Sequence, residues 1–248
     1  MVCPSVSDAR ALLTLAVLCL ACYQDVKTRE IDDRLWYVLV GLGFPTVVFE
    51  LSTRLSPGYL TLYVVSVCTG LALSAALYYA KLMGGADAKA IMAFSLLELP
   101  APWRSILSTI PPLAILTNAV VLSVATPLIL MLRNIILFGK RLWEGMCRDE
   151  PLWKRALAVL VLTKVKVGEY RKKPHAYVLA EDRSSGCTRI VLNLSAPEDI
   201  VLPPEELRDE EEVWVSYLIP YILVLTAGYV TYKITGPLLE LLLKAWLS

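Results

Sequence analysis

Long apolar stretches alternate with short polar ones along most of this 248-residue chain. An α-helix rises 1.5 Å per residue and the hydrocarbon core of a bilayer is about 30 Å thick, so the longer stretches can each cross a membrane. Six stretches are interpreted as spans. They are residues 9–24, 35–51, 59–81, 88–99, 104–138 and 213–234. The pattern therefore predicts an α-helical polytopic membrane protein with six transmembrane helices.

Two of these spans have unusual lengths. Between Asp87 and Pro100 lie only a dozen residues, about 18 Å of helix, so either the bilayer thins there or Asp87 lies below the lipid surface. Irregular backbone at that depth is tolerated only beside protein or water, and we therefore expect a wet, protein-lined pocket around Asp87. The fifth span is overlong, and Pro111-Pro112 predicts a break or kink near its start.

One polar segment, residues 139–212, is long enough to form a soluble domain. A helix-like stretch is followed by three clusters of residues that favour β-strands, which indicates a small α+β insertion before the last helix. The helix-like stretch is 140–160, and the clusters are 161–167, 175–181 and 188–194. The expected domains are a membrane domain, the soluble insertion and a sixth span with its tail. Their boundaries are 1–138, 139–212 and 213–248.

Lysine and arginine gather in alternate connections between the spans. The basic connections are the first loop with Lys27, the third connection with Lys81 and Lys89, and residues 139–212, which hold about half of all the lysines and arginines. Basic connections stay on the cytoplasmic side, so the insertion is expected in the cytoplasm with both termini outside. Asp25 and Asp87 then share the cytoplasmic face.

Composition excludes several classes of function. The chain is 56% hydrophobic with a mean hydropathy of +0.58, and its net charge of +1 gives no sign of a nucleic-acid partner. Cys19 and Cys22 form a single Cys-x-x-Cys, and the one histidine, His175, lies far along the chain, so we expect no metal and no cofactor. Most of the six cysteines lie in or beside apolar segments, where free thiols pack as small hydrophobic groups.

Asp25 and Asp87 are the candidate catalytic residues. Each follows an apolar stretch at the point where a membrane-buried chain would reach a wet interface, and a carboxylate there is a functional candidate. Two carboxylates that share one proton are the basis of aspartyl protease chemistry. The rival acids of the first loop are expected to cap the second span, or to attract a basic substrate. These rivals are Glu30, Asp32 and Asp33.

Further acids and lysines have less specific roles. Glu50 and Glu98 lie near the opposite face, where we expect water to solvate them. Lys27 and Lys89 each follow a candidate aspartate by two residues. They could modulate the protonation of the aspartates, and snorkelling to lipid headgroups explains them equally well.

Two other protease chemistries require residues that this chain lacks at the necessary positions. A zinc protease is excluded because the chain lacks His-Glu-x-x-His, and a membrane Ser–His dyad is excluded because His175 falls in the insertion. A transporter that uses Asp25 and Asp87 as proton or cation sites remains the alternative, although transporters usually contain internal repeats and none is evident here.

The two motifs resemble those of the GxGD-type intramembrane aspartyl proteases. Asp25 is followed six residues later by Ile31, and Gly84-Gly85-Ala86-Asp87 leads into a hydrophobic helix. The chain is most similar to archaeal preflagellin peptidases, a branch of the type IV prepilin peptidases. It departs from the first motif, because Ile31 is followed by Asp32 where the family commonly has proline. The ten-residue first connection is also too short for the cysteine-rich domain typical of the bacterial enzymes.

The resemblance implies an activity and its partners. It implies catalysis by Asp25 and Asp87, with backbone support from Gly84, Gly85 and Ala86. The implied substrates are archaellin or pilin-like precursors, whose short basic leader is cut at the cytoplasmic face of the cell membrane. The other expected partner is the lipid bilayer, and methyltransferase activity is not expected.

Overall fold

The computed structural model describes residues 5–53, 56–102, 104–183, 186–192, 207–217 and 220–247. The chain divides into two compact units, one formed by residues 1–123 with 220–248 and the other by residues 124–219. The first unit is helical. Its helices are α1 (Val6–Thr28), α2 (Arg34–Thr53), α3 (Pro57–Tyr79), α4 (Gly85–Leu97), α5 (Pro111–Ser123), α9 (Tyr221–Thr235) and α10 (Leu238–Leu247), with a 3₁₀ turn at Leu107–Thr109.

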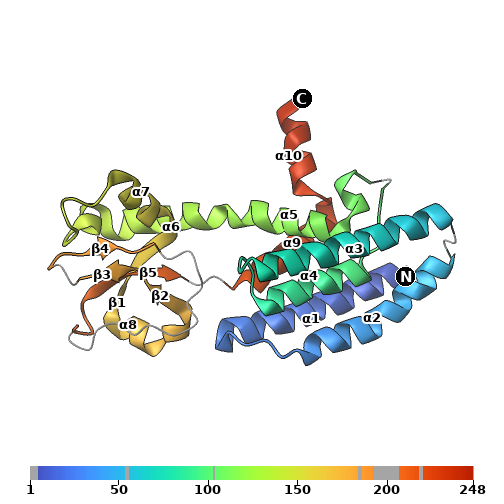
Figure 1. The fold of residues 1–248 in the computed structure, drawn as a ribbon, viewed down its shortest axis with the longest axis horizontal. Helices are drawn as coiled ribbons and strands as arrows, with labels where there is room; N and C mark the ends of the chain where they lie inside the picture. Colours follow the sequence, from blue (N-terminus) through green and yellow to red (C-terminus); the bar gives the residue numbers. More distant parts are fainter. Residues whose placement is uncertain are drawn as a thin grey trace. The chain divides into compact units, whose positions relative to one another are not determined.

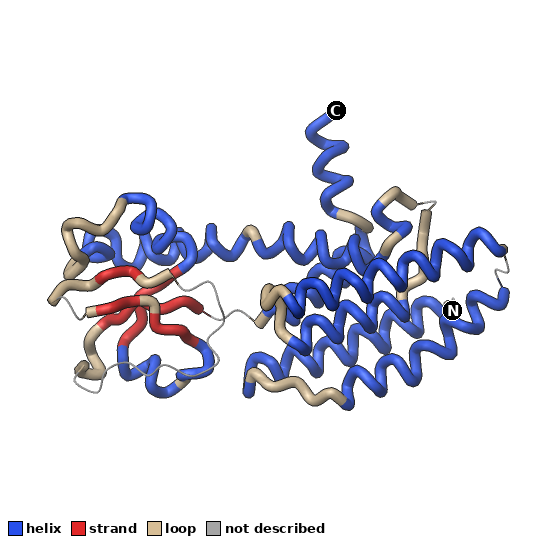
Figure 2. The backbone as a smooth tube through the Cα atoms, in the orientation of Figure 1, coloured by secondary structure: helices blue, strands red, loops and turns tan. Residues whose placement is uncertain are grey.

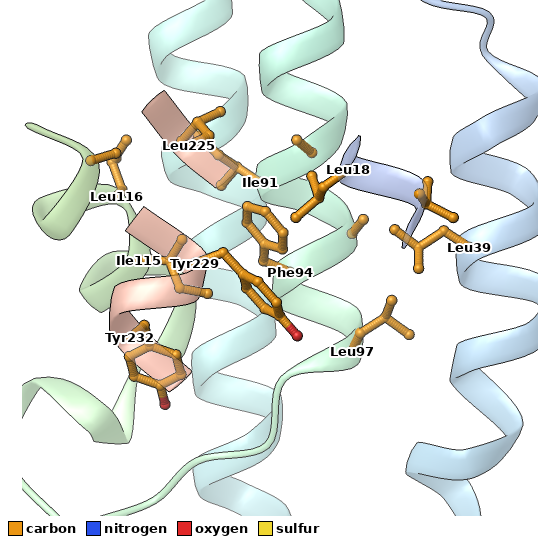
Figure 3. Packing of buried hydrophobic residues seen from close by; sticks show 14 of the residues in the cluster. Leu18, Leu39, Ile91, Phe94, Leu97, Ile115, Leu116, Leu225, Tyr229 and Tyr232 are labelled. Carbon is orange, nitrogen blue, oxygen red and sulfur yellow. The ribbon is translucent and has the colours of Figure 1, made fainter. Parts of the chain in front are cut away.

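Helix α4 lies at the centre of the first unit and is covered by α2, α3, α5 and α9. It is apolar on nearly all sides, and more than half of its residues are buried, as a helix inside a protein requires. Figure 1 shows α1 to α4 side by side, and Figure 3 shows the core around Phe94, whose ring stacks on Tyr229 with centroids 5.3 Å apart. The core of this unit therefore forms around the helix that carries Asp87.

Two glycines allow helices to approach one another closely. A Cβ added at Gly70 on α3 would overlap Ser95 of α4. One added at Gly228 on α9 would lie 2.7 Å from the carbonyl oxygen of Ile115 on α5. Both positions need a residue without a side chain because neighbouring helices occupy the space.

Among the described residues, four helical stretches are long and apolar enough to cross a membrane, or five if the bent pair α9 and α10 counts as one span. The four are α1, α2, α3 and the stretch Pro111–Phe138. The prediction of six spans is therefore not confirmed. Helix α4 has only 13 residues, consistent with the short stretch noted in the sequence. The predicted break near Pro111 is confirmed, because α5 begins there.

The second unit is a small α+β fold (Figure 2). Strand β5 (Glu212–Tyr217) is the centre of a three-stranded antiparallel sheet, paired with β1 (Leu162–Lys166) on one side and β2 (Tyr177–Leu179) on the other. Strands β3 (Glu181–Asp182) and β4 (Arg189–Ile190) form a second antiparallel pair. The helices of this unit are α6 (Ala125–Phe138), α7 (Leu152–Val161) and α8 (Val167–Lys172), with 3₁₀ turns at Gly139–Trp143 and Pro174–Ala176.

The structure confirms strands within the three predicted clusters, of which residues 193 and 194 lie outside the described residues. It corrects the start of the sixth span. Residues 213–217 belong to β5 and not to a membrane helix, because their backbone pairs with β1 and β2 and Pro220 then precedes α9. The second unit also begins earlier than residue 139. On α6, the buried Asn134 donates to the carbonyl oxygen of Leu162 at 2.7 Å and accepts from the Thr163 hydroxyl at 2.9 Å, which joins α6 to β1.

Two cysteines outside the apolar segments are paired, which the sequence pattern did not predict. Cys147 and Cys187 form a disulfide across 40 residues of chain, with Cα atoms 5.2 Å apart. Beside it, Met146 and Thr188 form a β-bridge. The disulfide therefore fastens the segment before α7 to the hairpin of β3 and β4.

Candidate active site

Asp25 lies in the last turn of α1. The helix ends three residues later, because Arg29 adopts a left-handed conformation (φ 61°) and its N–H donates to the carbonyl oxygen of Asp25 at 3.1 Å. The Asp25 side chain is half-buried. One turn earlier, the Cys22 sulfur and the Thr226 hydroxyl lie 3.2 Å apart, which joins α1 to α9. Asp25 thus sits on a helix end that is fixed to the core of the unit.

Asp87 lies in the first turn of α4, where the positive end of the helix dipole favours an acid. Gly84 is the N-cap, and a Cβ added there would lie 3.2 Å from Oδ2 of Asp87, so the carboxylate is folded back against the Gly-Gly turn. The buried Ser74 hydroxyl of α3 donates to the carbonyl oxygen of Ala88 at 2.7 Å. The residue next to Asp87 is therefore held by a neighbouring helix.

The two aspartates come from different helices that share two neighbours, since both α1 and α4 pack against α2 and α9. They are close enough for the charge of Asp25 to act on the Asp87 carboxyl. The Asp87 charge in turn acts on Tyr221, the first residue of α9. We did not select Tyr221 from the sequence, because nothing in the pattern places the start of the last helix beside the second motif. Tyr221 is therefore a further polar residue whose surroundings include the charge of Asp87.

The two candidate lysines have different surroundings. Lys27 lies over the ring of Tyr23, with Nζ 5.5 Å from the ring centroid. Lys89 forms an ion pair with Asp33, with Nζ and Oδ1 2.6 Å apart. Both groups of that pair are about half exposed, so it contributes at most about 1 kcal/mol. Its position matters more than its strength, because it joins the loop that follows Asp25 to the helix that carries Asp87.

The acids of the first loop also differ in their surroundings. Asp33 is engaged with Lys89, and Asp32 accepts the N–H of Arg34 at 2.9 Å, which caps the start of α2 as the sequence suggested. A cavity of about 440 Å³ opens between the end of α1 and this loop. Lys27, Glu30 and Asp32 are among the residues that line it. Glu30 and Asp32, two of the three predicted leader contacts, therefore line the same cavity, a groove at the end of α1.

The expectation that water solvates Glu50 and Glu98 is wrong. Glu98 is 3% exposed, accepts from the Tyr229 hydroxyl at 2.9 Å and pairs with Lys233 at 2.6 Å. Glu50 pairs with the buried Arg10 at 3.0 Å. Their partners are distant in sequence, and both carboxylates are neutralised inside the protein because a buried charge requires a partner.

Known proteins resemble this chain over much of its length. The sequence pattern of the type IV leader peptidase family matches residues 12–139, just over half of the chain and the part that contains Asp25 and Asp87. A preflagellin peptidase of Methanocaldococcus jannaschii is 26% identical in a match that covers 88% of this chain and 90% of that protein. Together with several apolar helices, these matches indicate a multi-pass membrane peptidase. This chain belongs to the type IV leader peptidase family.

Proposed function

We propose that this protein is an aspartyl endopeptidase that removes the short basic leader from preflagellin-like or pilin-like precursors. The family match and the similarity to a preflagellin peptidase support the reaction and the class of substrate. They favour a peptidase over a transporter that uses the same acids. The observation that carries the aspartyl mechanism is the position of Asp25 and Asp87, which lie on separate helices that pack against the same two neighbours, α2 and α9.

In this mechanism the two carboxyl groups share one proton. The ionised carboxylate takes a proton from a water molecule, whose oxygen attacks the scissile carbonyl carbon, while the protonated carboxyl donates its proton to the carbonyl oxygen. The resulting tetrahedral diol collapses: the C–N bond breaks, the leaving amine takes the proton that the first carboxylate removed from water, and one hydroxyl proton of the diol passes to the other carboxylate. Gly84 and Gly85 support this step by leaving room for an extended substrate backbone beside Asp87.

The orientation in the membrane is part of the proposal. We take α4 as a short additional pass at the centre of the unit, which raises the count to six when the bent pair α9 and α10 is one span. Its burial by α2, α3, α5 and α9 supports this, because a helix too short for the bilayer must be surrounded by protein. The basic connections then lie in the cytoplasm, and the cleavage site opens to that side.

The groove at the end of α1 is the proposed binding site for the leader. Its carboxylates, Glu30 and Asp32, would attract the lysines and arginines of a basic leader. An exposed pair of opposite charges contributes about 1 kcal/mol, so each carboxylate changes the affinity by about fivefold. Lys27 in the same groove would limit how closely a cationic residue approaches.

The experiment is cleavage of a purified precursor by the full-length protein in detergent, with kcat and KM measured separately. Asp25→Asn and Asp87→Asn should each lower kcat at least about 100-fold, because an amide can neither ionise nor share the proton. Asp8→Asn makes the same change at the other end of α1, where the amide can still serve the capping pair with Ser5. It should cleave at the wild-type rate.

Asp32→Asn provides a second comparison. Its amide oxygen can still accept the N–H of Arg34, so the cap of α2 is kept while the charge is lost. We expect KM to rise about fivefold for a basic leader with kcat within twofold of wild type. Wild-type kcat in Asp25→Asn or Asp87→Asn would refute the dyad. Loss of kcat in Asp8→Asn would show that the assay reports folding.

A further inference from the structure

A charged cavity lies at the end of the helical unit that is remote from Asp25 and Asp87. Its volume is about 170 Å³, far more than the ~15 Å³ that one water molecule requires. The polar lining comes from helix ends that meet at this face. Its charged members are Arg10 of α1, Glu50 of α2, Glu98 and Arg104 from the segment after α4, and Lys233 of α9.

The charges of this cavity do not balance. It contains three cations and two carboxylates, so one positive charge is in excess. Arg10 is paired with Glu50 at 3.0 Å and Lys233 with Glu98 at 2.6 Å. Arg104 is exposed, and within the described residues no carboxylate forms an ion pair with it. The surplus charge is therefore that of a flexible arginine at the rim.

A second arginine lines the cavity from the buried side. Arg10 is only 2% exposed, and its Nη atoms are used by Thr46 and Glu50, yet its Nε has no hydrogen-bond partner in the described part of the chain. An unpartnered buried N–H costs free energy, and a guanidinium that lines a cavity is suited to an anionic oxygen. Two arginines with donors to spare, one buried and one at the rim, thus line the same space.

The neighbouring helix α10 shows what surrounds this end of the unit. It follows the last turn of α9 after a 59° bend, and none of the residues Leu238–Leu247 is buried. Apart from Glu240 and Lys244 its side chains are apolar, and Trp246 is 82% exposed. In the proposed topology α10 continues the last span where it reaches the lipid surface, with its apolar side chains in contact with lipid. Lipid headgroups are therefore the anions most concentrated beside the cavity.

We propose that this cavity binds the phosphate diester of an anionic membrane lipid headgroup. The single negative charge of the diester offsets the surplus positive charge, and Arg104 and Arg10 donate to its oxygens. Basic pockets between membrane helices take phosphate headgroups by the same chemistry. The lipid joins the ends of α1, α2 and α9 at the face remote from catalysis.

The test is a titration of the delipidated full-length protein in detergent, with bound lipid counted by native mass spectrometry. Phosphatidylglycerol should bind at one saturable site, and phosphatidylcholine, whose choline offsets the phosphate charge, should bind more weakly. Arg104→Gln should raise the dissociation constant for phosphatidylglycerol about tenfold, as the loss of a charge-assisted hydrogen bond predicts. Because Arg104 is exposed, its thermal unfolding without lipid should match wild type.

Arg34→Gln is the matched control, since Arg34 is an exposed arginine at the start of α2, at the opposite end of that helix from Glu50. It should leave the affinity unchanged. Equal weakening by both variants, or no effect of Arg104→Gln, would overturn the proposal. Displacement of phosphatidylglycerol by millimolar inorganic phosphate, with the same sensitivity to Arg104→Gln, would assign the site to a free anion and overturn the lipid.

Discussion

The contact between α5 and α9 gives a prediction that can be worked out from distances. Gly228→Ala places a Cβ 2.7 Å from the carbonyl oxygen of Ile115 and 2.8 Å from the backbone nitrogen of Ala119. Ordinary contacts begin at 3.4 Å, so the helices must separate by about 0.7 Å (3.4 minus 2.7). Backbone atoms cannot rotate away as the end of a side chain can, and the whole contact has to open.

The size of the effect follows from the packing that is lost. A gap of 0.5–1 Å forfeits about a quarter to a half of the dispersion energy of the atoms that face it, and overpacking costs about 1–3 kcal/mol. Asn118 increases the cost of opening the contact, because its amide donates to the carbonyl oxygen of Gly236 at 3.0 Å across it. Alanine is also a better helix former than glycine by about 1 kcal/mol, which offsets part of the loss.

Gly41→Ala in α2 separates the steric cost from the gain in helix propensity. No atom lies within 4 Å of an added Cβ at Gly41, so this variant gains helix propensity without any steric cost. The propensity gain is common to both variants, and the difference between them isolates the steric cost of about 1–3 kcal/mol. The free energy of unfolding can be measured by titration from a mild detergent into sodium dodecyl sulfate, followed by tryptophan fluorescence. If Gly228→Ala is as stable as Gly41→Ala, the close approach of α5 and α9 is not as described.

Two further predictions concern the active site and the sheet. Gly84→Ala should lower kcat about tenfold, because the added Cβ 3.2 Å from Asp87 Oδ2 displaces the carboxylate, whereas Gly41→Ala in α2 meets no atom within 4 Å and should cleave like wild type; equal rates would contradict this. Burial raises the pKa of Glu181 above 4.5, against the opposing effects of the Trp214 N–H and Arg183. The Glu181 contribution to stability is therefore fully present below pH 4.5 and is lost as pH rises through the folded-state pKa. Relative to Glu181→Gln, which keeps an acceptor for Trp214, wild type should lose stability between pH 4 and pH 7 in thermal unfolding, and a constant difference would refute the assignment.

The parts of the fold that depend on local sequence were predictable. The first three helices follow from the length of their apolar runs, and the start of α5 follows from Pro111. Both candidate aspartates could be identified because each ends such a run beside glycine or a basic loop. Whether they act as a catalytic pair remains a prediction that the asparagine variants test.

The parts that depend on distant partners were not predictable. The apolar run of β5 has the same composition as the first turns of a membrane helix, and periodicity cannot separate the two over six residues. Its valines and aromatic residues, with Pro220 after them, were the available signal for a strand. The burial of Glu98 depends on Lys233, 135 residues away, and no local pattern connects them.

The disulfide between Cys147 and Cys187 sets a condition on the cell in which the protein folds. In the chain-entropy description, closing a loop of 40 residues stabilises the folded unit by about 4 kcal/mol. The cytosol of most cells keeps thiols reduced, whereas hyperthermophilic archaea and bacteria maintain disulfides inside the cell. If the sheet unit lies in the cytoplasm, as proposed, it can keep this bond only in a cell of the second kind. Protein made in an ordinary bacterial cytosol would carry two thiols instead, and the yield of folded sheet unit would then depend on oxidation after the cells are opened.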